Sequence, residues 1–309
     1  MRYLVTGGAG FIGSHLVAEL RRTGAEVRVL DDFSSGKHEN LAASDGPGQI
    51  EVVEGDLRDR ATVTEAVRGI DVIFHEAAFV SVPASVEDPS ECFGVNCTGT
   101  QTLLEAARAA AVRRVVLASS AAVYGDSIEL PLTENTEARP LSPYAASKLV
   151  DEIYAALYTK ALDLEVCALR YFNVFGPRQR PDTQYAAAVP IFIRQLLRKE
   201  RPTIFGDGGQ TRDLISVRDV VRANLIAAVH PAAAGEVFNV CTGRKTRILD
   251  LVAALRELIP NSPVPVFGPA RNGDIYESIG STTKAKAILG FEAETPLLAG
   301  LKETVEWMQ

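Results

Sequence analysis

Cysteine, basic charge and long apolar runs are all scarce in this chain of 309 residues, and each scarcity excludes a class of protein. The four cysteines lie in apolar strand or helix contexts without CxxC or Cys/His spacing, so we expect buried reduced thiols and no metal centre. The net charge of -7 argues against nucleic acid or an anionic membrane as a partner. No apolar run reaches the roughly 18 residues that a membrane span needs. The cysteines are Cys92, Cys97, Cys167 and Cys241.

The remaining composition is that of an ordinary soluble enzyme. Hydrophobic residues make up 47% of the chain, which is enough for a large core. The chain opens directly into a predicted core strand and leaves no room for a signal peptide, so we expect a cytoplasmic protein.

The most informative pattern is the glycine-rich run VTGGAGFIG at residues 5–13, between a predicted strand at 2–6 and a predicted helix at 11–22. Glycines let the backbone turn tightly and approach a pyrophosphate, whose charge then meets the free N–H groups and the positive end of the helix dipole. An ordinary tight turn is the alternative when such a motif stands by itself. The residues expected to form this contact are Gly7, Gly10, Phe11, Ile12 and Gly13.

A second predicted strand at residues 26–30 favours the nucleotide interpretation. It ends in Asp31 and Asp32, where a dinucleotide fold places a carboxylate that accepts from the adenosine ribose hydroxyls. That carboxylate would repel a 2′-phosphate, so NAD is favoured over NADP. Asp56 follows a third strand and is expected either to contact adenine or to be a solvated loop acid.

Apolar runs that alternate with helical patterns predict an α/β fold, a doubly wound parallel sheet of the Rossmann type. Strands are expected near 2–6, 26–30, 50–54, 71–75, 114–119 and 165–170. The second half is less regular, with helices expected near 187–199, 218–229, 248–259 and up to Trp307, and a strand at 213–217. We expect residues 1–172 to bind the dinucleotide and residues 173–309 mainly to form a smaller C-terminal substrate-binding domain, with the chain crossing back to the sheet.

The chemistry is expected where Tyr144 and Lys148 lie four residues apart on one face of a predicted helix that Ser142 caps. One cation at about 4 Å, in an effective dielectric of about 20, contributes roughly 4 kcal/mol and lowers the pKa of a phenol by about three units. A phenolate base near neutral pH then becomes available. A partly exposed tyrosine beside a solvated lysine is the alternative, but Ser119 and Ser120 end a core strand at the edge of the sheet that binds ligands.

Two other polar features are expected to carry no chemistry. His75 ends the fourth strand and is predicted to be a core histidine with its hydrogen bonds satisfied. The acid-rich stretch at 134–137 is predicted to be a solvated loop.

Together these residues resemble the extended short-chain dehydrogenase/reductase superfamily over the full length of the chain. The resemblance rests on the glycine motif, on Asn96 in VNCTGT, on the run SSAAVYG at 119–125 and on the pair Tyr144 and Lys148. It implies NAD as the cofactor and a homodimer built from helices near 92–110 and 144–160. Beyond the glycine motif, the expected cofactor contacts are Asp31, Asp32, Ser34, Asp56, Leu57, Ala77, Ala78, Asn96, Ser119, Tyr144, Lys148 and Tyr171.

Within the superfamily the chain is most similar to UDP-hexose 4-epimerases, particularly those acting on UDP-N-acetylglucosamine. The similarity lies in SVPAS at 81–85, RYFNVFGPRQ at 170–179 and GDGGQTRD at 206–213. By position it implies that Ser120 and Tyr144 bind the sugar 4′-hydroxyl and that Lys148 holds the nicotinamide ribose and tunes Tyr144; these three are the expected catalytic residues. The expected substrate contacts are Ser81, Ser85, Ser120, Tyr144, Asn173, Val189, Arg212, Arg271, Asp274 and Ser278.

The resemblance implies a redox cycle, in which Tyr144 takes the 4′-hydroxyl proton, the C4 hydride passes to NAD, and the 4-keto sugar turns over before the hydride returns. Sister dehydratases and decarboxylases carry a carboxylate one or two positions after the catalytic Ser or Thr, where this chain has Ala121 and Ala122. Elimination and decarboxylation therefore lack their acid/base group. The alternatives are a UDP-glucuronate 4-epimerase, an NAD-dependent sugar dehydrogenase and a non-catalytic NAD-binding sensor.

Four positions bear on substrate and cofactor. Asn173 favours a neutral hexose over a uronate, whereas Arg180 keeps the uronate alternative open. Val80 stands where some galactose epimerases carry a lysine toward the cofactor pyrophosphate. Ser278 stands four residues after Asp274, at the gatekeeper position where plain UDP-glucose epimerases often carry a tyrosine. A small residue there leaves room for an N-acetyl group.

Overall fold

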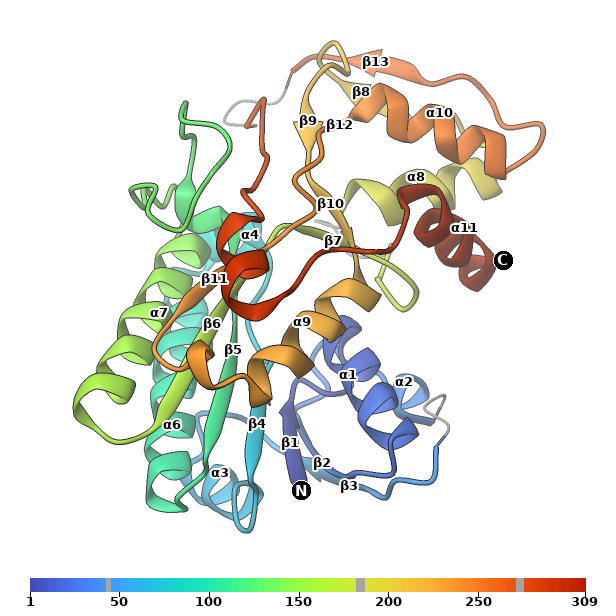
Figure 1. The fold of residues 1–309 in the computed structure, drawn as a ribbon. Helices are drawn as coiled ribbons and strands as arrows, with labels where there is room; N and C mark the ends of the chain where they lie inside the picture. The colour runs from blue at the N-terminus through green and yellow to red at the C-terminus, as the bar shows by residue number, and fades with distance from the viewer. Residues whose placement is uncertain (43–45, 182–186, 271–274) are drawn as a thin grey trace.

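The centre of the computed structural model, which describes residues 1–42, 46–181, 187–270 and 275–309, is a seven-stranded parallel sheet (Figure 1). Its order is β11, β6, β5, β4, β1, β2, β3, so the chain moves outward in one direction from β1 and in the other from β4. This confirms the predicted doubly wound fold, whose switch point between β1 and β4 is where such sheets bind ligands. The strands are β1 (Arg2–Thr6), β2 (Glu26–Asp31), β3 (Ile50–Glu54), β4 (Val72–His75), β5 (Arg114–Ser120), β6 (Glu165–Tyr171) and β11 (Val237–Val240).

Helices cover both faces of this sheet, which is why its central strands are apolar almost throughout. On one face, α1 (Phe11–Arg22) and α9 (Val217–Val229) pack over a core that includes Leu16 and Phe74. On the other face, α3 (Arg60–Ala66), α6 (Gly99–Ala109) and α7 (Pro143–Ala161) pack over a core that includes Leu103 and Val115. The two helix layers keep the carboxyl ends of the strands aligned along one edge of the sheet.

The second half of the chain lies above that edge and has an apolar core of its own (Figure 1). This core joins α8 (Ala188–Leu197), α10 (Ile248–Leu258) and α11 (Leu297–Met308). Its short strands form pairs: β7 (Asn173–Phe175) with β10 (Leu214–Ser216), β8 (Thr203–Phe205) with β13 (Val266–Gly268), and β9 (Thr211–Arg212) with β12 (Thr246–Arg247). The predicted helices are confirmed. The predicted strand at 213–217 is shorter, because Ser216 caps α9.

The chain crosses back to the sheet as predicted, since β11 pairs with β6 and α9 covers the first core. The exact division at residue 173 stays a prediction. The remaining elements are α2 (His38–Ala42), α4 (Val82–Glu87), α5 (Pro89–Phe93), the π-helical turns η1 (Gly94–Thr98) and η4 (Ala285–Leu289), and the 3-10 turns η2 (Ala121–Tyr124) and η3 (Pro231–Ala233).

The stretch at 134–137 is a loop with Asn135 and Glu137 exposed, as predicted, but Oε1 of Glu134 accepts the backbone N–H of Asn239 at 2.8 Å and so ties the loop to β11. All four cysteines are buried, as predicted. Among the described helices, none combines the length and the apolar character that a bilayer crossing requires.

Candidate active site

The loop between β1 and α1 is shaped for close approach of a ligand to backbone. Gly7 has a φ of +65°, and a Cβ there would lie 2.6 Å from the amide nitrogen of Ala77. A Cβ at Gly13 would lie 2.2 Å from the carbonyl oxygen of Gly7. Gly10 precedes α1 and no side chain caps the helix, so the N–H groups of the turn that begins at Phe11 face an open N-terminus. This cradle fits the pyrophosphate of a dinucleotide.

The two acids after β2 lie in different environments. Asp31 is 6% exposed, and its carboxylate accepts the N–H groups of Ala9 at 2.8 Å and Phe33 at 2.9 Å. Burial raises the pKa of Asp31, against the effect of these two hydrogen bonds. Asp32 is exposed and accepts from the backbone and the hydroxyl of Ser34 at 2.9 and 2.6 Å. Each oxygen of Asp31 keeps a lone pair for a ribose hydroxyl, while its bond to Ala9 fixes the acid to the phosphate loop.

Asp56 is paired with a cation. Arg58 contacts its carboxylate at 2.6 Å and also contacts Glu91 at 2.7 Å. Leu57, between the acid and the arginine, is 6% exposed and belongs to the core under α3 and α6. The adenine contact of Asp56 stays a prediction, and the structure pairs this acid with Arg58, which also joins it to Glu91 of α5.

Asn96 uses its whole amide inside the protein. Its side chain is 1% exposed; Oδ1 accepts the N–H of Phe79 at 2.7 Å, and Nδ2 donates to the carbonyl of Phe79 at 3.1 Å and to Oγ of Ser147 at 2.8 Å. These bonds clamp the segment after β4, which holds Ala77 and Ala78, against α7. The structure therefore shows Asn96 as a residue that positions the predicted cofactor-binding segment, and a direct cofactor contact stays a prediction.

The first turn of α7 is anchored at two points, and it carries Tyr144. Oγ of Ser142 accepts the N–H of Ala145 at 3.1 Å, as the predicted helix cap requires. Oγ of Ser85 accepts the N–H of Tyr144 at 3.2 Å and donates to the carbonyl of Val82 at 2.6 Å. Ser85 is fully buried, so what the structure shows is an anchor for the backbone of Tyr144, and its predicted sugar contact stays a prediction.

Ser120 lies at the end of β5, against which α7 packs. Its Oγ accepts the N–H of Ala122 at 3.1 Å and keeps its own proton. The hydroxyl can therefore donate to a substrate oxygen. Ala121 and Ala122 begin the turn η2 and bring no carboxylate to this edge of β5.

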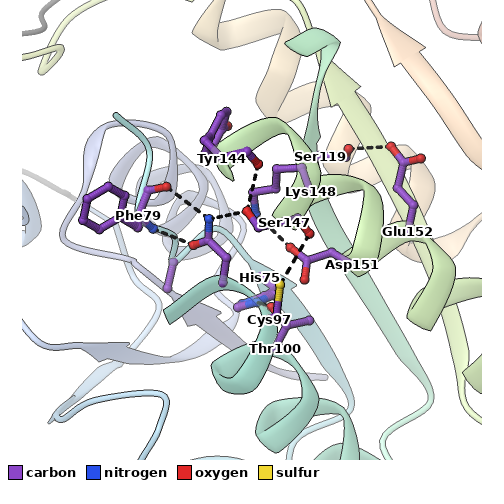
Figure 2. A network of polar contacts seen from close by, with 12 residues as sticks. His75, Phe79, Cys97, Thr100, Ser119, Tyr144, Ser147, Lys148, Asp151 and Glu152 are labelled. Carbon is purple, nitrogen blue, oxygen red and sulfur yellow. Dashed lines mark hydrogen bonds and ion pairs between the residues drawn. The ribbon is translucent and has the colours of Figure 1, made fainter. Parts of the chain in front are cut away.

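Lys148 has a partner that the sequence analysis missed. Its Nζ lies 3.2 Å from Oδ2 of Asp151, and the two side chains are 2% and 1% exposed (Figure 2). Burial lowers the pKa of Lys148, but the carboxylate of Asp151 and then Tyr144 outweigh it and raise the pKa above its ordinary value. Asp151 was detectable in principle, because residues 144, 148 and 151 share one helix face.

Glu152 is a second acid that the sequence analysis missed. It accepts the hydroxyl of Ser119 at 2.5 Å and two N–H groups of Arg170 at 2.8 and 2.7 Å. All three residues are at most 5% exposed. The guanidinium of Arg170 lies 4.7 Å from the ring centroid of Tyr124. The hydroxyl of Ser119 is thus committed to holding the ends of β5 and β6 to α7, and its cofactor contact stays a prediction.

Glu76, directly after β4, is the third missed acid. It accepts the hydroxyl of Tyr171 at 2.7 Å, and that hydroxyl accepts Nδ2 of Asn224 at 2.7 Å. Burial raises the pKa of Glu76 to about 7, although Tyr171 and Lys148 lower it. The predicted nicotinamide neighbour Tyr171 is therefore fixed by an acid that titrates near neutral pH.

Three more of the predicted substrate contacts, Asn173, Arg212 and Ser278, lie in the second half of the chain. Asn173 donates to the carbonyl of Asp213 at 3.3 Å, and Nη1 of Arg212 donates to the carbonyl of Thr211 at 2.9 Å. The N–H of Ser278 donates to the same carbonyl at 3.3 Å, so the backbone of Ser278 lies next to Thr211, the residue before Arg212. Arg271 and Asp274 lie outside the described residues.

Two further predicted contacts serve local structure. Oγ of Ser81 caps α4 by accepting the N–H of Ala84 at 3.2 Å. Val189 is 2% exposed, and its side chain belongs to the apolar core of the second half. Substrate contact by either residue stays a prediction.

Residues 3–241 match the NAD dependent epimerase/dehydratase family. The chain belongs to this family. The match covers the glycine cradle and the three expected catalytic residues, Ser120, Tyr144 and Lys148. It confirms the expected enzyme class and NAD as the cofactor. Within the described residues, no group of three or more His, Cys, Asp and Glu side chains is placed to hold a metal ion.

Members of the epimerase/dehydratase family resemble this chain from end to end. A UDP-glucose 4-epimerase of Mycolicibacterium smegmatis is 42% identical over 312 residues, 100% of this chain and 99% of the relative. The crystal structure of a UDP-glucose 4-epimerase from Thermotoga maritima, with UDP-glucose, is 39% identical with a TM-score of 0.93 and covers 100% of this chain and 98% of its own. A UDP-N-acetylglucosamine 4-epimerase of Methanobrevibacter ruminantium, in complex with UDP-N-acetylmuramic acid, is 35% identical with a TM-score of 0.94 and covers 99% and 97%.

Proposed function

We propose that the protein is an NAD-dependent 4-epimerase of UDP-hexoses that interconverts UDP-GlcNAc with UDP-GalNAc and UDP-Glc with UDP-Gal. The observation that carries the proposal is the arrangement of Ser120, Tyr144 and Lys148 at the carboxyl edge of the sheet, with Ala121 and Ala122 after Ser120. The relatives that match from end to end and are named for 4-epimerisation support it.

In the proposed reaction the residues of this chain move one proton and hold the sugar. Tyr144 takes the proton of the 4′-hydroxyl, while the hydroxyl of Ser120 donates to the same sugar oxygen. Lys148, which its ion pair keeps protonated, supplies positive charge next to the phenol. NAD, when bound in the glycine cradle, supplies the acceptor and the donor of the C4 hydrogen. The 4-keto sugar then turns over and receives the hydrogen on its other face.

The reaction class follows from the absence of an acidic side chain directly after Ser120. Elimination of water and loss of carbon dioxide both need an additional acid or base beside the 4-keto sugar. The two positions after Ser120 are alanines, and the two acids of α7 are both engaged: Glu152 by Arg170 and Ser119, and Asp151 by Lys148. We therefore propose that the 4-keto sugar is only reduced again.

The substrate assignment rests on Ser278. Its backbone lies next to Thr211, the residue before Arg212, which the resemblance assigns to UDP, and its side chain is small enough to leave space for a 2-acetamido group. By the resemblance, Asn173 stands where epimerases of uronates tend to carry a threonine, which favours a neutral sugar. We therefore expect turnover of the acetylated pair to be at least comparable to that of the plain pair.

Replacing Ser278 with tyrosine tests this assignment. We expect Ser278→Tyr to suppress turnover of UDP-GlcNAc and to spare UDP-Glc, because the ring fills the space that the acetamido group needs. The control is Glu277→Tyr, which places the same ring on the neighbouring residue of an extended segment, where side chains alternate in direction. Product separation by chromatography measures both pairs. Equal loss of both pairs, or no wild-type turnover of UDP-GlcNAc, would replace the proposal with a plain UDP-galactose 4-epimerase.

The alternative functions separate in one spectroscopic assay. A sugar dehydrogenase accumulates NADH and absorbs increasingly at about 340 nm, whereas an epimerase returns every hydride and shows no net change. A non-catalytic NAD-binding sensor also shows no change in absorbance, but it forms no product. A UDP-glucuronate 4-epimerase converts the uronate in the same chromatographic assay and ignores the neutral sugars.

We also propose that the protein forms a homodimer through α5, α6 and α7. Phe93, Ile153 and Leu157 on these helices are 58%, 59% and 47% exposed, which is unusual for large apolar side chains on helices that pack against each other. A two-fold contact would cover them. Sedimentation velocity tests this: a single species at the mass of one chain would refute it.

A further inference from the structure

Lys148, the cation that the proposed mechanism places beside Tyr144, forms a buried ion pair with Asp151. Lys148 and Asp151 face each other within α7 at 3.2 Å, almost without solvent contact (Figure 2). A buried ammonium with no counter-ion tends to lose its proton, and a buried carboxylate with no donors tends to gain one. Both groups must therefore be held in the charged state by their surroundings.

A line of polar groups leads from β1 toward the carboxylate of Asp151. Nδ1 of His75 lies 2.7 Å from the hydroxyl of Thr6, Nε2 of His75 lies 2.9 Å from the hydroxyl of Thr100 on α6, and that hydroxyl lowers the pKa of Asp151. The N–H of Ala77 donates to the hydroxyl of Thr6 at 3.3 Å. The line joins the strand that precedes the phosphate loop to the helix that carries Lys148.

One assignment of the protons directs the whole line toward Asp151. The hydroxyl of Thr6 accepts a backbone N–H and has its own proton to donate to Nδ1 of His75. His75 is 1% exposed, and burial lowers its pKa to about 3, so the ring is neutral and, in this assignment, carries its proton on Nε2. Nε2 then donates to the hydroxyl of Thr100, whose own proton is available to Asp151. With this tautomer of His75 the donors all point toward the carboxylate, an arrangement that stabilises its ionised form.

We propose that Asp151 is a positioning residue that keeps the ammonium of Lys148 protonated and fixed beside Tyr144, and that Thr6, His75 and Thr100 keep Asp151 ionised. This deepens the proposed function, on which its catalytic part rests. It gives His75, the core histidine of the fourth strand, a part in setting the charge of the site.

The charged state of Lys148 depends on few neighbours. The titratable groups that interact with Lys148 or Asp151 are His75 at the end of β4, Glu76 directly after β4, Cys92 of α5, Cys97 of η1, and Tyr144 and Glu152 of α7. Among the effects that raise the pKa of Lys148, the carboxylate of Asp151 is the largest. Without it, only Tyr144 and Glu76 oppose the effect of burial, so we expect the pKa of Lys148 to fall.

The first test is thermal unfolding of the protein without substrate, with Asp151→Asn against wild type between about pH 7.5 and about pH 10. In the variant, the expected pKa of Lys148 is lower in the folded state than in the unfolded state, so protonated Lys148 destabilises the fold. This destabilisation disappears as pH rises toward the unfolded-state pKa. In wild type the folded-state pKa of Lys148 is raised, so Lys148 stabilises the fold throughout this pH range. We expect the difference in Tm to shrink with rising pH. A difference that stays constant would show that Asp151 only fills space, and would overturn the proposal.

The second test is the pH–rate profile of the epimerase. In Asp151→Asn the alkaline limb should move to lower pH by about one unit or more, and Asp151→Glu should restore most of it. Glu65→Gln on α3, an exposed acid paired with Arg68, is the control and should leave the limb in place. An unmoved limb in Asp151→Asn would overturn the proposal. If no sugar is turned over, the proposed function fails, and the unfolding test still decides the role of Asp151.

A milder variant covers the case in which Asp151→Asn does not fold. Thr100→Val keeps the shape of the side chain and removes the hydroxyl that lowers the pKa of Asp151. Burial already raises that pKa to about 6, so the acidic limb of the profile should move to higher pH. An acidic limb identical to that of wild type would show that the line of donors does not act on Asp151.

Discussion

Glu76 couples the charge of the site to the stability of the whole protein. Burial raises its pKa from the ordinary 4.5 to about 7, although Tyr171 and Lys148 oppose the rise. An acid whose folded-state pKa is raised contributes stability that is present below the unfolded pKa and is lost as pH rises through the folded one. The rise of about 2.5 pH units corresponds to about 3 kcal/mol, at about 1.36 kcal/mol per unit. Glu76 is only partly shielded, so we expect about 2 kcal/mol.

The variant Glu76→Gln isolates this effect. Glutamine keeps an oxygen that accepts the hydroxyl of Tyr171 at the same place and stays uncharged at every pH. Relative to wild type, the variant should gain about 2 kcal/mol of unfolding free energy between about pH 5 and about pH 8.5, measured by urea denaturation. The control is Glu54→Gln, an exposed acid that ends β3 at the same edge of the sheet. Wild-type and Glu76→Gln curves that run parallel across this pH range would refute the reasoning.

Two further substitutions test the catalytic residues. Tyr144→Phe should keep fold and NAD affinity but lose about 10² to 10⁴ in turnover, because it removes only the oxygen that takes the proton; near wild-type turnover would remove Tyr144 from the mechanism. Lys148→Met should move the pH–rate profile to higher pH and weaken NAD binding measured by calorimetry, and an unmoved profile would mean that Lys148 does not set the base. Because the single variant leaves Asp151 buried without its partner, Lys148→Met/Asp151→Asn should recover stability but not turnover.

The sequence was sufficient for the fold because its signals are local and repeated. Each central strand is an apolar run bounded by turn residues, and the six predicted strands lie within one residue of the observed bounds. The glycine motif and the Ser142 cap were recognisable for the same reason, since each acts on the backbone of its own segment. The seventh strand, β11, was missed because only its pairing with β6 distinguishes it from a short strand of the second half.

The buried acids could not be predicted in the same way. A lysine followed three residues later by an aspartate is typical of a solvated helix pair, and only the packing of α7 against β5 and α6 shows that Lys148 and Asp151 are covered. Asn96 and Ser85 were predicted as ligand contacts, whereas the structure shows their hydrogen bonds to Phe79 and Tyr144. Such bonds join residues that lie far apart in the sequence, so the residue type alone does not distinguish a ligand contact from a structural one.

The place of β11 makes the two halves of the chain inseparable during folding. β6 is complete at Tyr171, but the strand that covers its outer edge is residues 237–240. The guanidinium of Arg114 in β5, 2% exposed, is paired with Glu165 of β6 and also donates to the carbonyls of Ala227 and His230, at the end of α9 and directly after it. On the ribosome, the growing chain therefore carries an unpaired strand edge for more than sixty residues of synthesis, and one nitrogen of Arg114 lacks its partners until α9 is complete. A gene cut after residue 172 would yield a product that aggregates rather than a smaller dinucleotide-binding protein.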